Sequence, residues 1–187
     1  MFGIRRTLAA AVGVLLLSGT AYAVDPFTLT SPAFKDGGLL TIKNAGNNKA
    51  NPNCIGENLS PPLAWANPPA GTKSFAIVMI NPEGQGGLGN VHWVAYGIPA
   101  SMTGLAEGEA SKPSDKFVGG KGRAGLDVYY GPCPPPNFAY GHYVFTLIAT
   151  DLEPKELPPG LTRDELFAKL NGHGKGGAGI VAIYQKP

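Results

Sequence analysis

The sequence carries almost no excess charge of either sign. Its 187 residues include 15 Lys and Arg against 13 Asp and Glu, and two of the basic residues, Arg5 and Arg6, lie among the first 23 positions. Leaving those two out gives 13 basic against 13 acidic residues. Such a chain lacks the basic stripe of proteins that bind nucleic acids or anionic lipid surfaces. We therefore expect no nucleic-acid partner.

Long apolar runs are also missing. The run at residues 8–17 is shorter than the roughly 20 residues that a membrane-spanning helix needs. It follows Arg5 and Arg6 and precedes the small-residue sequence AYA at 21–23, which is the pattern of a secretory signal peptide. We predict a signal peptide at residues 1–23 that is cleaved, and a periplasmic or secreted mature protein without stable membrane insertion. An uncleaved membrane anchor is the alternative.

Cysteine is scarce, and Cys54 and Cys133 are the only two. In an oxidising compartment a lone pair of cysteines usually forms a disulfide. We expect these two to be bonded, which in the chain-entropy model stabilises the fold by about 4–5 kcal/mol because the closed loop is long. A thiol nucleophile or a metal ligand is the alternative, since sequence alone does not show that the sulfurs approach each other.

Glycine and proline are abundant instead, with 27 and 18 residues. They cluster in turn-like segments between short apolar runs, an arrangement typical of all-β domains. The sequence predicts strands at 39–43, 74–80, 91–98, 126–130, 142–151 and 179–184. It predicts one helix at 162–172, where Thr162 and Glu165 form a capping box. We expect residues 24–187 to form a single, mainly antiparallel β domain with a small helix near its C-terminus.

The segment FAIVMINPEGQGGLGNVHWVAY (75–96) contains the spacing G-x-G-x-x-G at Gly84, Gly86 and Gly89. This spacing binds dinucleotides when a helix follows, because the helix N-terminus holds the pyrophosphate. Here residues 91–98 follow, and their Val, Trp, Tyr and Ile side chains favour a strand. No Walker sequence G-K-[ST] follows the glycines either. We interpret them as a flexible connection between two strands and expect no nucleotide cofactor.

His92 lies in the second of those strands. Strict alternation places His92, Val94 and Tyr96 on one face and the intervening residues on the other. An imidazole among apolar side chains needs a hydrogen-bond partner if it is buried. The local pattern leaves both a structural histidine and a ligand-binding histidine open.

Five longer segments follow one another in a characteristic order: NPNCIGENLSPPLAWANPPAGTKSFAIVMINPEG (51–84), VHWVAYGIPASMTGLAEG (91–108), YGPCPPPN (130–137), HYVFTLIATD (142–151) and LPPGLTRDELFAKLNGHGKGGAGIVAIY (157–184). Together they resemble the phosphatidylethanolamine-binding protein family, and in particular its bacterial branch, which is related to Raf kinase inhibitor protein. The resemblance implies a β-sandwich of two antiparallel sheets. It also implies a small pocket at one end that binds phosphate-like or other small anions, including phospholipid headgroups.

The resemblance implies ligand-binding roles for residues from four places in the chain, namely Asn81, Glu83, His92, Gly131, Pro132, Tyr143 and His142. His92, Tyr143 and the Gly-Pro loop match the family pattern. Asn81 stands where the family has an Asp, and Glu83 stands at its second acidic position. The proline that ends this motif in the family is absent, and Gly84 and Gln85 follow Glu83 instead.

Gly141 occupies the position of the family's second histidine, with His142 next to it. In a regular strand Gly141 and Tyr143 face one way and His142 the other, so His142 replaces the missing histidine only if a bulge re-aims it. The changes at 81 and 141 remove one negative and one potential positive charge. We therefore expect weak anion binding and a neutral polar ligand at least as readily as a phosphate. We expect Glu83 to become a partner of His92 if the glycine loop folds inward.

These features predict an exported, non-catalytic binding protein without cofactor or metal. Its partner is a small anionic or polar ligand, and a protein partner is a second expectation because some relatives act by binding and inhibiting proteins. The alternative is a periplasmic hydrolase in which His92 acts with Glu83 or with Cys133 as nucleophile. The histidines show no tight metal-ligand spacing.

Overall fold

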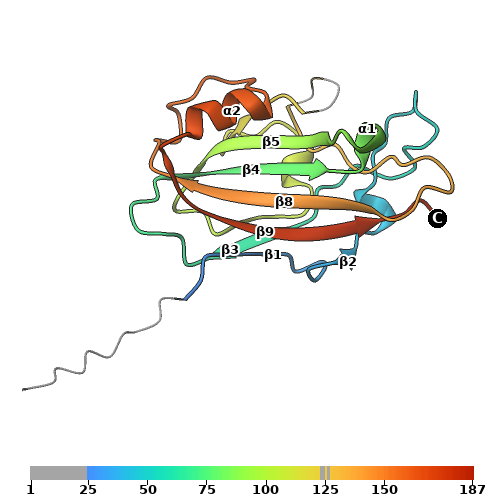
Figure 1. The fold of residues 1–187 in the computed structure, drawn as a ribbon, viewed down its shortest axis with the longest axis horizontal. Helices are drawn as coiled ribbons and strands as arrows, with labels where there is room; N and C mark the ends of the chain where they lie inside the picture. The colour runs from blue at the N-terminus through green and yellow to red at the C-terminus, as the bar shows by residue number, and fades with distance from the viewer. Residues whose placement is uncertain (1–24, 123–124, 126) are drawn as a thin grey trace, which may run out of the picture.

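The computed structural model describes residues 25–122, 125 and 127–187 (Figure 1). Its elements in chain order are β1 (Thr28–Thr30), β2 (Gly38–Leu39), the 3-10 helix η1 (Ile42–Asn44), β3 (Leu63–Ala66), β4 (Ser74–Asn81), α1 (Gly84–Gly87), β5 (Asn90–Pro99), β6 (Gly104–Leu105), the 3-10 helix η2 (Glu109–Ser111), β7 (Val118–Gly119), β8 (Gly141–Thr150), α2 (Arg163–Leu170) and β9 (Gly174–Tyr184). The predicted signal peptide lies outside the described residues. Within them, no helix has the length and hydropathy needed to cross a membrane.

The strands form two sheets. One has six strands in the order β2-β9-β8-β4-β5-β7, and the other has three in the order β1-β3-β6. The long strands β4, β5, β8 and β9 lie side by side in Figure 1, and each neighbouring pair is antiparallel. The expected β-sandwich is therefore confirmed. The short edge strand β2 departs from it, since it pairs with β9 in parallel.

The main core lies between the two sheets and follows from the period-2 alternation of the long strands. Phe75, Ile77 and Met79 of β4 and Phe145 of β8 are fully buried there, together with Trp65 of β3. The predicted strands at 74–80, 91–98, 142–151 and 179–184 correspond to β4, β5, β8 and β9. Only β9 differs noticeably, because it begins at Gly174.

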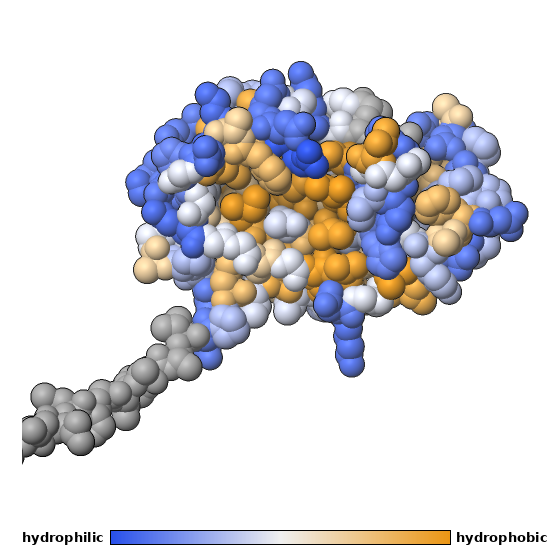
Figure 2. Space-filling model, in the orientation of Figure 1, coloured by the Kyte–Doolittle hydropathy of each residue, from blue (hydrophilic) through white to orange (hydrophobic). Residues whose placement is uncertain are grey.

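The outer face of the six-stranded sheet carries a second, smaller core under α2. Leu166 and Leu170 of this helix are buried together with Val78 and Tyr96. The predicted capping box is confirmed, because Thr162 Oγ1 accepts from the Glu165 backbone N–H and Glu165 Oε2 accepts from that of Thr162. The helix covers only one end of this face. Figure 2 shows apolar residues at the surface of the sheet beyond α2.

Two predicted strands are wrong. Residues 39–43 contain only the end of β2, because the Thr41 N–H and hydroxyl both donate to Asn44 Oδ1, at 3.1 and 3.0 Å, and start the turn η1. Residues 127–130 are irregular, and Leu126 lies outside the described residues. Tyr129 is nevertheless buried, with its hydroxyl donating to Asn44 O at 2.9 Å. Leu40 and Tyr129 are buried by loops, whereas Leu39 and Ile42 are exposed, and a hydrophobic pattern does not distinguish these cases from burial in a sheet.

Candidate functional site

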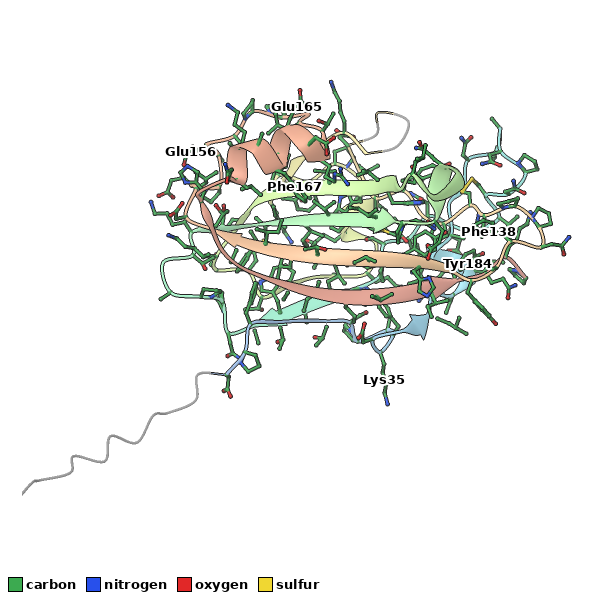
Figure 3. The ribbon with its side chains drawn as sticks, in the orientation of Figure 1. Lys35, Phe138, Glu156, Glu165, Phe167 and Tyr184 are labelled. Atoms are coloured by element: carbon green, nitrogen blue, oxygen red, sulfur yellow. A yellow bond between two sulfur atoms is a disulfide. The ribbon has the colours of Figure 1, made fainter. Side chains whose placement is uncertain are left out.

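A cavity of about 400 Å³ lies at the end of the large sheet where β4 ends and β5 and β8 begin. Its lining consists of Asn51, Asn53, Asn81, Glu83, Gly84, Gln85, Gly86, Asn90, His92, Tyr130, Cys133, Pro134, Pro135, Phe138 and Tyr143. Figure 3 labels Phe138, which comes from the loop before β8 and lies at the same end of the molecule as Tyr184, the last residue of β9. The lining residues thus come from strand ends and from loops far apart in the sequence.

Four of the predicted site residues, Asn81, Glu83, His92 and Tyr143, line this cavity together. Gly131 and Pro132 are outside the lining, although their neighbours Tyr130 and Cys133 belong to it. Their backbone joins a neighbouring loop, since the Gly46 N–H donates to Pro132 O at 2.9 Å. His142 is outside the lining. The structure therefore brings together four residues from β4, the following loop, β5 and β8 that the family resemblance had indicated.

His92 reaches the cavity because of a β-bulge. Met79 pairs with Trp93 whereas Ile80 pairs with Val91, so His92 is an extra residue of β5 opposite β4. The predicted facing is wrong for this reason, since a bulge shifts the alternation by one residue. His92 does not share a face with Val94, which belongs to the core under α2. Its ring instead meets the edge of Tyr143, with ring centroids 5.1 Å apart.

Both ring nitrogens of His92 are hydrogen bonded within the protein. Nδ1 lies 2.8 Å from the Tyr130 carbonyl oxygen, which can only accept, so Nδ1 carries a proton. Nε2 lies 2.9 Å from Asn90 Nδ2, which can only donate. This arrangement is that of a neutral imidazole protonated at Nδ1, and the side chain is almost fully buried. Asn90 was not predicted, although its position just after the glycines and two residues before His92 was a usable signal.

Tyr143 and Asn81 line the cavity together with His92. Burial is the main cause that raises the pKa of Tyr143 to about 12, while the side chain of Asn81 acts in the opposite direction. The phenol therefore stays protonated at neutral pH. Asn81 Oδ1 is buried and has no hydrogen-bond partner. A Cβ atom at Gly141 would lie 3.0 Å from Asn81 Nδ2, so these two side chains occupy the space beside the glycine.

Glu83 contacts His142 through both carboxylate oxygens. Its Oε1 lies 2.7 Å from His142 Nδ1, and its Oε2 accepts from the His142 backbone N–H at 3.2 Å. Partial burial raises the pKa of Glu83, but its backbone hydrogen bond and the contacts with His142 outweigh burial and leave that pKa below the ordinary value. His142 thus holds Glu83 at the cavity edge. The expected turn of Glu83 towards His92 is replaced by this contact.

The glycine loop forms one side of the cavity. The short helix α1 contains left-handed residues, with φ of 53° at Gln85 and 71° at Gly86, and β5 begins at Asn90. A dinucleotide site would need a regular helix at this place. The glycine segment contains one distorted helical turn, which was not expected. A strand follows it, as expected.

Cys54 and Cys133 form a disulfide that links two loops at the cavity wall. The expected bond is confirmed, and the alternative that Cys133 acts as a thiol nucleophile is wrong because its sulfur is bonded. The hydroxyl of Tyr130 lies 3.3 Å from Cys54 Sγ. Among the described residues, no group of three or more His, Cys, Asp or Glu side chains is arranged to hold a metal ion.

Comparison with known proteins identifies relatives that match most of this chain. The sequence is 33% identical over 165 residues to LppC of Mycobacterium tuberculosis (strain ATCC 25618 / H37Rv), named as a candidate lipoprotein, which covers 88% of this chain and 75% of LppC. It is 29% identical over 184 residues to the UPF0098 protein YbcL of Escherichia coli (strain K12), covering 96% of this chain and 98% of YbcL.

The crystal structure of E. coli YbcL, described as a new member of the mammalian PEBP family, superimposes with a TM-score of 0.75 at 30% identity. It covers 85% of this chain and 98% of YbcL. The sequence model of the family described as phosphatidylethanolamine-binding protein matches residues 30–185. The chain therefore belongs to the phosphatidylethanolamine-binding protein family.

Proposed function

We propose that this protein is an exported, non-catalytic binding protein that holds a small polar ligand, phosphate-like or neutral, in the cavity at the end of the large sheet. The observation that carries the proposal is the convergence of Asn81, Glu83, His92 and Tyr143 on one cavity of about 400 Å³. This volume lies within the range of small-molecule sites, which combine apolar walls with a few convergent polar groups.

The candidate catalytic residues already form hydrogen bonds or a disulfide within the protein, which favours binding over catalysis. A general base needs a free lone pair within reach of a substrate proton. His92 uses Nδ1 on Tyr130 and Nε2 on Asn90, and Glu83 uses both oxygens on His142. Cys133 is bonded to Cys54. Each residue of the hydrolase alternative is therefore engaged within the fold.

Export is supported by two independent features. The first is the order of Arg5 and Arg6, the apolar run 8–17 and AYA at 21–23. The second is the disulfide between Cys54 and Cys133, since such bonds persist in oxidising compartments. We accordingly propose a periplasmic or secreted location.

Nuclear magnetic resonance of the mature protein tests the binding proposal. Inorganic phosphate, phosphoethanolamine and neutral sugars are added separately while the ring signals of His92 and Tyr143 are followed. We expect at least one of these probes to shift both signals in a saturable way, and a Tyr143→Phe variant to bind it more weakly. Asn171→Ala, at the end of α2 outside the cavity lining, is the matched control. If no probe shifts the cavity signals, the proposed function is wrong.

A further inference from the structure

We infer that the cavity selects an uncharged ligand rich in hydroxyl groups, of the saccharide type, over a phosphate. This inference rests on the proposed function and specifies its ligand. Its basis is the composition of the lining. Among the described residues, those that line the cavity include five side-chain amides and three aromatic rings but no lysine or arginine.

The charges of the lining oppose an anion. Phosphate sites in proteins usually contain arginine or lysine, whose charged N–H groups pair with the phosphate oxygens. Here Glu83 is the one carboxylate of the lining, and its lowered pKa keeps it negatively charged at neutral pH. Lys186 is outside the lining, and its amino group donates to Pro52 O and to Oδ1 of the lining residue Asn53. An entering phosphate would meet a negative charge and no dedicated cation.

His92 adds to this selectivity through its hydrogen bonds. A histidine assists an anion best as an imidazolium with an N–H directed at it. In this structure the Nδ1 proton is donated to the Tyr130 carbonyl, and Nε2 accepts from Asn90. The carboxamide of Asn90 has a second contact, because its Oδ1 lies 3.4 Å from Gln85 Nε2, which orients Nδ2 towards His92. The imidazole thus presents its ring, and no charged N–H, to a ligand.

Side-chain amides and hydroxyl groups can both donate and accept hydrogen bonds. A hydroxyl donates one hydrogen bond and accepts others, and a carboxamide carries both functions a short distance apart. Five carboxamides belong to the lining, those of Asn51, Asn53, Asn81, Gln85 and Asn90. The oxygens of Asn51, Asn53 and Asn90 already accept hydrogen bonds within the protein. The oxygen of Asn81 is buried without a hydrogen-bond partner. A ligand hydroxyl can donate to this oxygen, whereas the ionised oxygens of a phosphate group cannot.

The aromatic residues complement the amides. Tyr130, Phe138 and Tyr143 lie in the same lining. The partly buried rings of Tyr130 and Phe138 offer apolar surface to the C–H face of a sugar ring. The Tyr143 hydroxyl, with a pKa of about 12, remains a donor over the physiological range. A flat apolar surface next to groups that both donate and accept suits a cyclic polyol better than a compact tetrahedral anion.

The test compares two classes of probe on the intact mature protein at constant ionic strength. Glucose, N-acetylglucosamine and maltose form the neutral arm, and inorganic phosphate and phosphoethanolamine form the anionic arm. Binding is followed by the NMR signals of His92, Tyr143 and the side-chain amide of Gln85. We expect one of the neutral probes to bind at least tenfold more tightly than either anion.

A charge variant sharpens the comparison. Gln85→Glu retains the shape of the side chain but replaces two amide donors by a carboxylate, and we expect it to weaken binding of the neutral probe at least fivefold. Asn171→Asp makes the equivalent change at the far end of α2 and should leave binding unchanged. If an anion binds more tightly than all three sugars, or if Gln85→Glu binds sugar as well as the parent protein, the inference is overturned while the proposed function stands. If none of the probes binds, both the inference and the proposed function are overturned.

Discussion

His92 shows what a single residue contributes to this site. Regular alternation would direct its ring to the outer face of the sheet with Val94, where α2 packs. The bulge opposite Met79 and Ile80 re-aims it towards Tyr143. Once there, the ring needs partners for two nitrogens in a buried place, and Tyr130 and Asn90 provide them. The location of the candidate site therefore depends on a backbone irregularity as much as on the residue types.

Replacing Asn90 by alanine tests its role as partner of His92. The substitution leaves Nε2 of a buried imidazole without its donor, and an unsatisfied buried group of this kind costs about 1–3 kcal/mol. We expect the free energy of unfolding in urea to fall by that amount. Asn171→Ala, an exposed asparagine, should change it by less than about 0.5 kcal/mol. Equal effects of the two substitutions would contradict the assigned hydrogen bond.

The sequence predicted four of the fifteen residues of the cavity lining as ligand-binding residues, but not their contacts. His92, Tyr143, Asn81 and Glu83 were found because a family pattern marks their positions. The bulge at His92 was missed because it arises from the register between β4 and β5, which no local pattern of β5 encodes. The pairing of Glu83 with His142 was missed for a related reason. His142 points away from the cavity as alternation predicts, yet the loop after β4 curves round to meet it.

At the scale of elements, the loop between β4 and β5 is attached at its start and free in its middle. Glu83 fixes the start to β8 through His142. Gly86, Gly87 and Gly89 have positive φ and open space around them, and the side chain of Leu88 is 88% exposed. Few contacts and a left-handed backbone give low local stability. The loop that forms one side of the cavity therefore depends on the Glu83–His142 contact for its position.

Removing the imidazole tests this attachment. We expect His142→Ala to increase amide hydrogen exchange at residues 84–89 severalfold, while the global free energy of unfolding falls by at most about 1 kcal/mol because the pair is partly exposed. His173→Ala is the matched control, because His173, just before β9, makes a comparably exposed contact with Asp151, just after β8. Unchanged exchange in residues 84–89 would contradict the attachment.

The same contact predicts a dependence on pH. The pKa of Glu83 is lower in the folded protein than its ordinary value of 4.5, so its contribution is complete above about pH 4.5 and is lost as pH falls through the folded-state pKa. We expect exchange at residues 84–89 to rise below that pH before the molecule unfolds. A Glu83→Gln variant should show no such acid-dependent step.

The helix α2 was predicted correctly because its signals are local. Thr162 and Glu165 satisfy backbone donors within four residues of each other, and no distant contact is needed for that. Thr162→Ala should lower the free energy of unfolding by about 1 kcal/mol, as loss of an N-cap typically does. Thr162→Ser retains the capping oxygen and should restore most of it. A full effect in the serine variant would argue against the cap.

At the scale of the molecule, the sandwich was predictable and the loops that complete the cavity were not. Long alternating strands such as β4 and β8 are specified by their own residues. The loops at residues 39–44 and 127–130 are joined instead by a buried contact, in which the Tyr129 hydroxyl donates to the Asn44 carbonyl. This contact joins residues 85 positions apart. The apolar residues of the loops resemble the sequence pattern of a strand, so local sequence does not reveal the contact.

The disulfide stabilises this loop region and therefore the whole fold. It joins positions 79 residues apart, and closing a loop of that length in the unfolded chain is worth about 4–5 kcal/mol in the entropic model. We expect a Cys54→Ser, Cys133→Ser double variant to lose that amount in urea unfolding compared with the oxidised protein. The parent protein under strong reductant should match the double variant. A loss below about 1 kcal/mol would show that the loops hold without the bond.

Tyr130 touches both the sulfur bridge and the imidazole. Its hydroxyl lies 3.3 Å from Cys54 Sγ, and its carbonyl accepts the Nδ1 proton of His92 at 2.8 Å. One residue therefore transmits changes at the bridge to the ring by direct contact. The NMR resonance of His92 should therefore report whether the disulfide between Cys54 and Cys133 is oxidised or reduced. Reduction of an empty, still folded protein should move this resonance and leave that of His173, at the opposite end of the sheet, where it was.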